Sequence, residues 1–215
     1  MKIKNLIITF VSAIALLLST SVVSFAKVVG DKIVLGAAVS LTGKYSSNGV
    51  HTQNGYNMAV ERINSMGGVK VGGKTYKFDI IYYDVESNPK RAAQLAERLI
   101  SQDGVEFMLG PYSSGLTKAM APVTEKYGVP MVEANGASRS LFTKGYKYLF
   151  AVLAPANLYL DVAIRTAVEL NGGKGVNIAM AFEQDAFSQD VRLGIVDAAE
   201  AVSYTHLTLP TILLV

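Results

Sequence analysis

The sequence predicts an α/β fold with a mostly parallel sheet and helices on both of its faces. Short apolar runs of strand length alternate with longer segments of helical spacing from residue 32 to residue 202, which is the pattern of consecutive βαβ units. Glycine is frequent, with 19 residues in a chain of 215, as many tight strand-to-helix turns require. A chain of this length buries a substantial core.

The first strand is predicted over 32–39, where a charged start leads into a continuous apolar run. A helix over 49–66 follows, and the paired glycines 67–68 end it. Its predicted inward side consists of Val50, Tyr56, Met58, Ala59 and Ile63.

The next strand is predicted over 76–83, which is rich in aromatic and β-branched residues. Asn88 and Pro89 have the form of an N-cap with proline at the first helical position, and a helix is predicted from there to Gln102. Its predicted inward side consists of Ala92, Leu95, Ala96 and Leu99.

The remaining elements continue the alternation. Further strands are predicted over 105–109, 130–133, 148–152 and 175–182, and further helices over 115–127, 157–170 and 188–202. Pro122 lies inside the first of these helices and predicts a local bend.

This alternation also predicts where a ligand binds. Right-handed crossovers bring every strand-to-helix loop to one edge of the sheet, and open α/β sheets bind ligands at that edge. The candidate site is therefore formed by the loops at 40–48, 84–88, 110–114, 134–138 and 183–188.

Residues 1–26 have the three parts of a cleaved secretory signal peptide. Lys2 and Lys4 give a positive start, an apolar run follows over 6–18, and Ser24-Phe25-Ala26 supplies small residues for cleavage after Ala26. The apolar run is too short for a spanning helix, and the chain has no Cys that could carry a lipid. We therefore expect a periplasmic mature protein that is not inserted in the membrane.

Without its first 26 residues the chain is close to electrically neutral, and it has no cluster of basic residues. Nucleic acid is therefore not expected as a partner. At the other end, residues 203–215 contain no acidic or basic side chain except one His, which is neutral, and they interrupt a helical pattern. We expect this tail to be non-native and the chain to break off near Val202, although a genuine terminal strand remains the alternative.

The motifs of nucleotide binding and of catalysis are incomplete. Gly43-Lys44 is followed by Tyr45 where a phosphate-binding loop needs Ser or Thr, and 110–115 lacks the spaced glycines of a dinucleotide site. Ser113 has Pro111 in place of the first glycine of a nucleophile elbow. With no Cys, and with His51 as the one His before the tail, we expect no cofactor, no metal site and no enzymatic activity.

The same loops suit the binding of a small molecule. A helix N-terminus presents free N–H groups and the positive end of a dipole, and Ser113 and Ser114 would add two hydroxyl groups there. The loop Asn135-Gly136-Ala137 would add a second edge, so that the two loops form a cradle for a carboxylate or an amide. Alternatively, the two serines only cap their own helix.

Five ordered segments together resemble the type I periplasmic binding proteins of the branched-chain amino-acid class. They are Leu41-Thr42-Gly43 with Tyr45; 59–64 with Gly67-Gly68; Tyr83-Asp84 with 89–93; Gly110-Pro111-Tyr112-Ser113-Ser114; and 129–137. The resemblance extends from Lys32 to Val202. It implies a fold of two α/β lobes joined by crossing hinge strands, with residues 27–150 in the first lobe and residues 151–202 at the start of the second.

The resemblance also implies which residues contact the ligand. Ser114 matches the serine that holds the ligand carboxylate, and Phe187 falls where aromatic residues of the second lobe cover the ligand. The full implied set is Asn48, Ser113, Ser114, Asn135, Gly136, Ala137 and Phe187. Asn135 and Ala137 stand where amino-acid binders have small or threonine side chains, which favours amides, ureas or aromatic acids over a plain leucine-like ligand.

The function that the resemblance implies is that of the substrate-binding component of an ABC importer. Such a protein captures a small polar solute between its lobes without a cofactor, works with a membrane permease and is monomeric. A sensor or receptor ligand-binding domain is the first alternative, and an α/β hydrolase is the second.

Overall fold

The computed structural model describes residues 27–201. The signal peptide predicted over 1–26 and the tail predicted over 203–215 lie outside the described residues. Within 27–201, no helix has both the length and the apolar character needed to cross a membrane.

A seven-stranded sheet organises most of the described chain. Its strands are β1 (Val28–Val29), β2 (Lys32–Val39), β3 (Val69–Val71), β4 (Lys74–Asp84), β5 (Met108–Leu109), β6 (Met131–Glu133) and β7 (Leu149–Ala151). The order is β3-β4-β2-β5-β6-β7, with β1 paired to β2 off this path. The five strands from β4 to β7 in this order are parallel, whereas β1 and β3 pair antiparallel to their neighbours. The predicted α/β class with a parallel sheet is confirmed.

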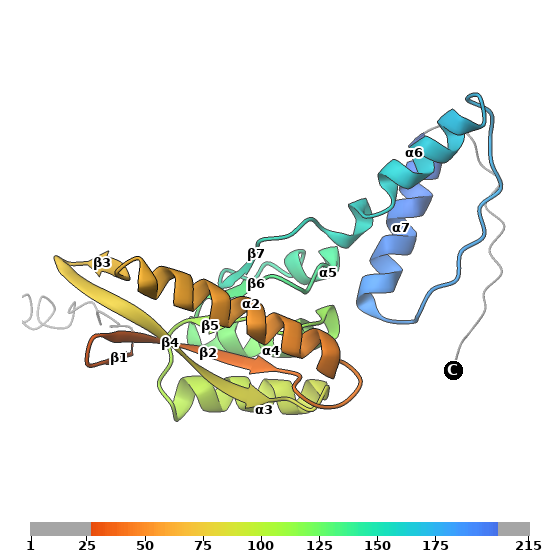
Figure 1. Ribbon diagram of the computed structural model, residues 1–215. Coiled ribbons are helices and arrows are strands. Elements are labelled where there is room, and N and C mark those ends of the chain that lie inside the picture. The colour runs from red at the N-terminus through yellow and green to blue at the C-terminus, as the bar shows by residue number, and fades with distance from the viewer. Residues whose placement is uncertain (1–26, 202–215) are drawn as a thin grey trace, which may run out of the picture.

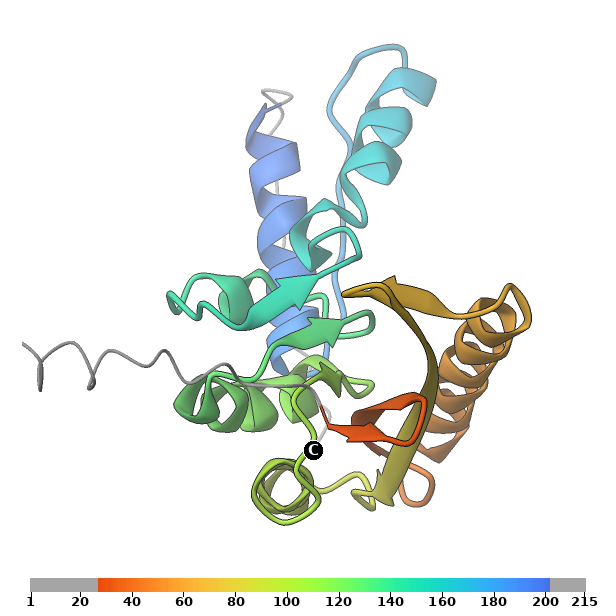
Figure 2. The ribbon, with the colours of Figure 1, turned by 90° about the vertical axis from the view of Figure 1, so that its left-hand side faces the viewer.

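Helices cover both faces of the sheet (Figures 1 and 2). Helix α2 (Ser46–Ser65) lies on one face, and α3 (Pro89–Ser101) and α4 (Ser114–Tyr127) lie together on the other. The main core forms between the sheet and these last two helices, where Leu99, Met108 and Leu116 are fully buried or nearly so. The predicted N-cap of α3 is confirmed, because the Asn88 side chain accepts a hydrogen bond from the Arg91 N–H at 3.1 Å.

The chain then leaves the sheet. After the short helix α5 (Arg139–Phe142) and β7, it passes through a 3-10 turn, η1 (Ala156–Leu158), into α6 (Asp161–Leu170) and α7 (Ala186–Ala201). These two helices lie side by side and extend away from the sheet (Figure 1). A second, smaller core of Ile164, Met180, Ile195 and Ala198 forms between them.

Two of the predicted elements differ clearly from this structure, in addition to the helix predicted over 157–170, which is interrupted between η1 and α6. The segment 175–182 was predicted as a strand, but it runs without regular structure apart from an isolated bridge at Ile178. The apolar side chains Ile178 and Met180 pack beside Ile164 of α6 and Ile195 of α7, and this burial accounts for the apolar pattern that predicted a strand. The predicted inward face of α2 is also wrong in part, because Met58 is 72% exposed whereas Gly49 and Thr52 are buried.

Candidate functional site

The order of the parallel strands reverses between β2 and β5, since the chain first adds β4 on one side of β2 and later β5 on the other. Such a switch point opens a crevice at the carboxyl ends of the strands. A cleft of about 520 Å³ lies there, within the usual range for small-molecule sites. Its lining comes from the strand-end loops, the segment between β7 and α6, and the start of α7 with the residues before it: Tyr45, Tyr112, Ser113, Ser114, Gly115, Ala134, Asn135, Ala137, Leu153, Tyr159, Glu183, Asp185, Phe187 and Ser188.

The loop after β2 is held in place by Asp84 at the end of β4. The Asp84 carboxylate accepts the N–H of Leu41 at 2.9 Å, the Thr42 hydroxyl at 2.7 Å and the N–H of Glu86 at 2.8 Å. Burial alone would raise the pKa of Asp84, but the hydrogen bonds from Glu86 and Thr42 outweigh it and hold the pKa below its ordinary value. Gly43 has φ +81°, and a Cβ there would lie 2.8 Å from the Ser87 hydroxyl, so this turn requires glycine.

The loop after β5 leads directly into α4. Ser113 occupies the N-cap position in an extended conformation, yet it makes no side-chain cap hydrogen bond. The Ser114 hydroxyl accepts the N–H of Ser138 at 3.1 Å, which leaves its own hydrogen free to donate. The alternative that both serines only cap their helix does not match these contacts. The first-turn N–H groups of a helix have no partners within it, so this end of the cleft offers donors to an anion or a carbonyl oxygen.

The loop after β6 is held from behind by Glu133, which is fully buried. Its carboxyl group accepts the N–H groups of Asn135 and Gly136 at 2.5 and 2.6 Å and the hydroxyl of Thr117 at 2.6 Å. Burial raises the pKa of Glu133 to about 7, although these three donors oppose the shift.

Two aromatic pairs line the cleft from opposite sides. Tyr45 and Tyr112, from the loops after β2 and β5, meet edge to face with ring centroids 5.7 Å apart. Tyr159 and Phe187, from the α6–α7 side, meet in the same manner at 5.6 Å. Such rings provide apolar walls for the body of a ligand.

Polar contacts connect the two sides. The Lys44 ammonium lies 2.6 Å from the Glu183 carboxylate, and both side chains are 60% exposed. The Asp190 carboxylate on α7 accepts the Ser138 hydroxyl at 2.5 Å and the N–H of Ser140 at 3.1 Å. Among residues 27–201 no group of three or more His, Cys, Asp or Glu side chains is placed to bind a metal ion.

The structure brings five of the seven predicted contact residues to the cleft: Ser113, Ser114, Asn135, Ala137 and Phe187. Asn48 lies in a neighbouring hollow of about 440 Å³ with His51 and Tyr56, and that hollow shares Tyr112 and Asn135 with the cleft. Gly136 is buried behind the lining of the cleft, and its N–H donates a hydrogen bond to the Glu133 carboxyl group.

Sequence reasoning missed Leu153 and Tyr159 on the cleft wall. No motif marks Tyr159, because its place depends on an interruption between η1 and α6 inside a segment predicted as one continuous helix. The loop 84–88 was predicted to be part of the site, but it contributes no residue to the lining of the cleft. It supports the loop after β2 instead, through hydrogen bonds of Asp84 and Ser87.

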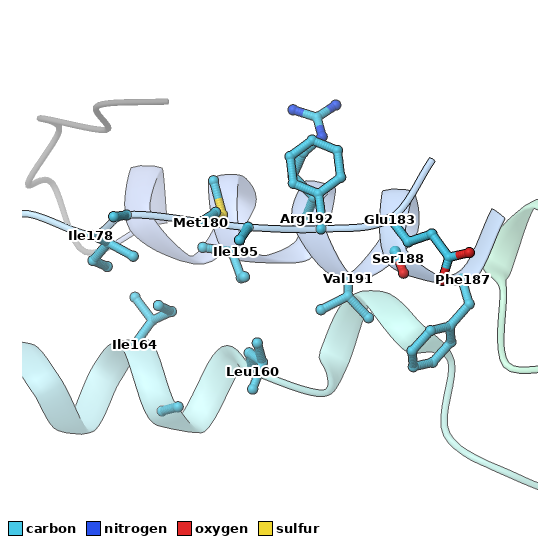
Figure 3. Close-up of a pocket in the computed structure, with 14 residues that line it drawn as sticks. Leu160, Ile164, Ile178, Met180, Glu183, Phe187, Ser188, Val191, Arg192 and Ile195 are labelled. Carbon is cyan, nitrogen blue, oxygen red and sulfur yellow. The ribbon is translucent and has the colours of Figure 1, made fainter. Parts of the chain in front are cut away.

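A second hollow, of about 440 Å³, lies between α6, α7 and the segment 178–183 (Figure 3). Ile164, Ile178 and Val191 project into it, and the Arg192 guanidinium lies 5.4 Å from the centre of the Phe182 ring. The lining is mostly apolar, with Glu183, Ser188 and Arg192 as its polar members, and it contains no helix N-terminus comparable to that of α4 in the cleft. We therefore assign the polar cleft, and not this hollow, as the candidate site.

A family model described as periplasmic binding protein matches residues 32–211. A curated relative, the leucine-, isoleucine-, valine-, threonine- and alanine-binding protein of Pseudomonas aeruginosa, is 26% identical over 175 residues, which are 80% of this chain and 46% of the relative. The chain thus spans about half the length of the curated relatives that it matches.

Solved structures with the same fold include two with different ligands. The branched-chain amino acid transporter substrate-binding protein LivJ of Streptococcus pneumoniae, in complex with isoleucine, matches with a TM-score of 0.68 and 25% identity over 83% of this chain and 48% of its own. An ABC transporter solute-binding protein of R. palustris, in complex with 4-hydroxybenzoate, matches with a TM-score of 0.68 and 24% identity over 85% of this chain and 47% of its own. The second likeness shows the fold alone.

Proposed function

Because this chain belongs to the periplasmic binding protein family, we propose that it comes from the substrate-binding component of an ABC importer. In this proposal the protein captures a small polar solute in the cleft between two lobes and delivers it to a membrane permease. Binding requires no chemistry and no cofactor. The protein works in the periplasm as a monomer, after removal of the signal peptide over residues 1–26.

The observation that carries the proposal is the chemistry of the cleft. Hydroxyl groups of Ser113 and Ser114 stand at the N-terminus of α4, and aromatic rings such as Tyr112 and Phe187 line the walls. This combination suits a small molecule with a carboxylate or amide at one end and an apolar or aromatic body. Amino acids and aromatic acids both have this form. The relative from Pseudomonas aeruginosa is named as an amino-acid-binding protein, and the LivJ structure contains isoleucine.

We further propose that residues 27–150 belong to the first lobe and residues 151–202 begin the second. The loops after β2, β5 and β6 then form one wall of the cleft, and the start of α7 forms the other. Ligand binding would draw these walls together, which is a hinge motion.

The test is a binding screen on the complete mature protein encoded by the gene. Thermal unfolding is measured with L-leucine, L-isoleucine, acetamide, urea and 4-hydroxybenzoate, and isothermal calorimetry follows each stabilising compound. A compound at a hundred times its Kd should stabilise the protein by about 2.7 kcal/mol. Stabilisation by one class, with loss of its cellular uptake on deletion of the gene, supports the importer. Binding without any uptake defect contradicts it.

Ser114 provides the residue-level test. Ser114→Ala should raise the Kd of the bound compound by about tenfold or more, because a hydrogen bond to a charged group contributes about 1.5–3 kcal/mol. Ser65→Ala is the matched control, since its hydroxyl donates only to the Arg62 carbonyl on an exposed part of α2. Equal affinity of the two variants would exclude Ser114 from the site.

A further inference from the structure

Glu133 is a buried acid that the binding chemistry described above does not use. It ends β6, and its side chain has no exposed surface. One carboxyl oxygen accepts the N–H groups of Asn135 and Gly136, and the other accepts the Thr117 hydroxyl. The single side chain therefore joins β6, the ligand loop 134–138 and helix α4.

Two glycines make room for this carboxyl group. A Cβ on Gly110, at the end of β5, would lie 2.2 Å from Oε2 of Glu133. A Cβ on Gly136 would lie 2.5 Å from the Thr117 hydroxyl oxygen and 3.0 Å from the Glu133 carboxyl carbon. Any side chain at either position would displace the acid, so the backbone on both sides is closed around it.

We propose that Glu133 is the positioning residue of the ligand cleft, holding the loop of Asn135 and Ala137 from behind and coupling the shape of this loop to its own protonation. This inference rests on the proposed function of the same cleft. The N–H groups of Asn135 and Gly136 are already bonded to Glu133 and are not free to bind a ligand. The loop instead contributes Ala134, Asn135 and Ala137 to the lining of the cleft.

A single hydroxyl group relays the protonation state toward the ligand. The Thr117 oxygen lies 2.6 Å from Oε2 of Glu133 and 2.9 Å from the carbonyl oxygen of Ser113, and its one hydrogen serves one of these acceptors fully. When Glu133 is ionised, the hydrogen points to the acid. When Glu133 is protonated, the acid donates to Thr117 and the Thr117 hydrogen turns to Ser113, at the rim of the cleft.

The surroundings place this exchange near neutral pH. Burial raises the pKa of Glu133 to about 7 against its hydrogen-bond donors. The titratable side chain that faces it from α2 is Tyr56, whose phenol donates to the Gly110 carbonyl at 2.6 Å and whose own pKa burial raises. From α4 and from the loop 134–138, its hydrogen-bond partners are the neutral groups of Thr117, Asn135 and Gly136.

The test follows backbone amide exchange over 134–138 in the complete mature protein without ligand, from about pH 5.5 to about pH 8.5 with correction for intrinsic rates. Glu133→Ala should speed exchange at Asn135 and Gly136 by about tenfold or more, because both lose a charged acceptor. Glu133→Gln keeps an acceptor oxygen and should restore protection, and it should abolish the pH dependence seen in the wild type. Glu125→Gln is the control, since that carboxylate accepts the N–H groups of Lys147 and Tyr148 at the surface.

The same variants are then titrated with L-leucine, acetamide and 4-hydroxybenzoate. For a compound that binds, Glu133→Ala should raise its Kd by about tenfold, and Glu133→Gln should flatten the pH profile of the Kd. Unchanged exchange in a folded Glu133→Ala protein, or a pH profile identical in wild type and Glu133→Gln, would overturn the inference. A wild type that binds nothing in the screen contradicts the proposed function, while amide exchange still decides the role of Glu133.

Discussion

Helix α2 packs through a glycine against Ser40, the first residue after β2, and this contact fixes where the loop after β2 begins. A Cβ on Gly49 would lie 1.8 Å from the carbonyl oxygen of Ser40 and 2.6 Å from its carbonyl carbon. Gly55, in the same helix, has open space where its Cβ would be. The two glycines therefore form a matched pair for Gly→Ala substitution.

The magnitudes follow from two opposing terms. Alanine is more favourable than glycine in a helix interior by about 0.8–1 kcal/mol, so Gly55→Ala should stabilise the protein by up to that amount. Gly49→Ala has at most the same stabilising gain in helix propensity as Gly55→Ala. It also overpacks the contact with Ser40, which lowers the free energy of unfolding by about 1–3 kcal/mol. Because the clash is with backbone atoms, which cannot rotate away, we expect the upper end of this range. Gly49→Ala should therefore be about 2–3 kcal/mol less stable than Gly55→Ala.

The assay is urea unfolding of the complete mature protein, followed by far-ultraviolet circular dichroism. Displacement of α2 should also disturb Tyr45, which directly precedes the helix and lines the cleft. Gly49→Ala should thus weaken ligand binding, whereas Gly55→Ala should not. Equal free energies of unfolding for the two variants would refute the close approach of α2 to Ser40.

Three further predictions concern stability. Glu133→Gln tests the raised pKa: ionisation at about 7 in place of 4.5 makes wild-type stability fall as pH rises through this window, by about 3 kcal/mol in total. The free energy of unfolding of the Gln variant, measured in urea at about pH 5 and about pH 9, should not show this decrease. Parallel pH profiles of the two proteins would contradict the raised pKa of Glu133. Asp84 has a lowered pKa, so its stabilisation is present above its unfolded pKa and is lost as pH falls through the folded pKa. Asp84→Ala should lower stability at neutral pH by about 1.5–3 kcal/mol and flatten the acid limb of the profile, and an unchanged acid limb would argue against the network with Thr42. Leu99 is fully buried under the sheet, so Leu99→Ala should cost about 2–5 kcal/mol in the same assay, and a loss below about 1 kcal/mol would contradict its burial.

The sequence predicted those elements whose local signals agree with their packing. Strand β2 forms over Lys32–Val39 as predicted, because it lies between β4 and β5 and its continuous apolar run is buried on both faces. In α3, Ala92, Ala96 and Leu99 are buried as predicted, since the helix has one clear apolar face. The prediction failed for α2 because its contact with the sheet uses small residues such as Gly49 and Thr52, which a search for large apolar side chains overlooks.

The candidate site was predictable to the extent that strand ends determine it. Ser113, Ser114 and Asn135 follow two adjacent parallel strands, so their convergence follows from topology. Glu133 was assigned to a strand and to the segment 129–137 of the resemblance, but not to the site, because its own residue type does not distinguish an inward acid at the end of a strand from a solvated one. The burial of Glu133 depends on Gly110 and Gly136, because the absence of side chains at these two positions leaves the space that the carboxyl group fills.

The two walls of the cleft are held in physically different ways. Buried or partly buried carboxylates fix the loops of the sheet: Asp84 holds the loop after β2, and Glu133 holds the loop after β6. Across the cleft, the connection includes the exposed ion pair of Lys44 and Glu183, and exposed pairs contribute about 0–1 kcal/mol. In the proposed hinge motion, the loss of this ion pair would therefore cost little. The hydrogen bonds from Ser138 and Ser140 to Asp190 also connect the loop after β6 to α7, so they would have to break or move with α7.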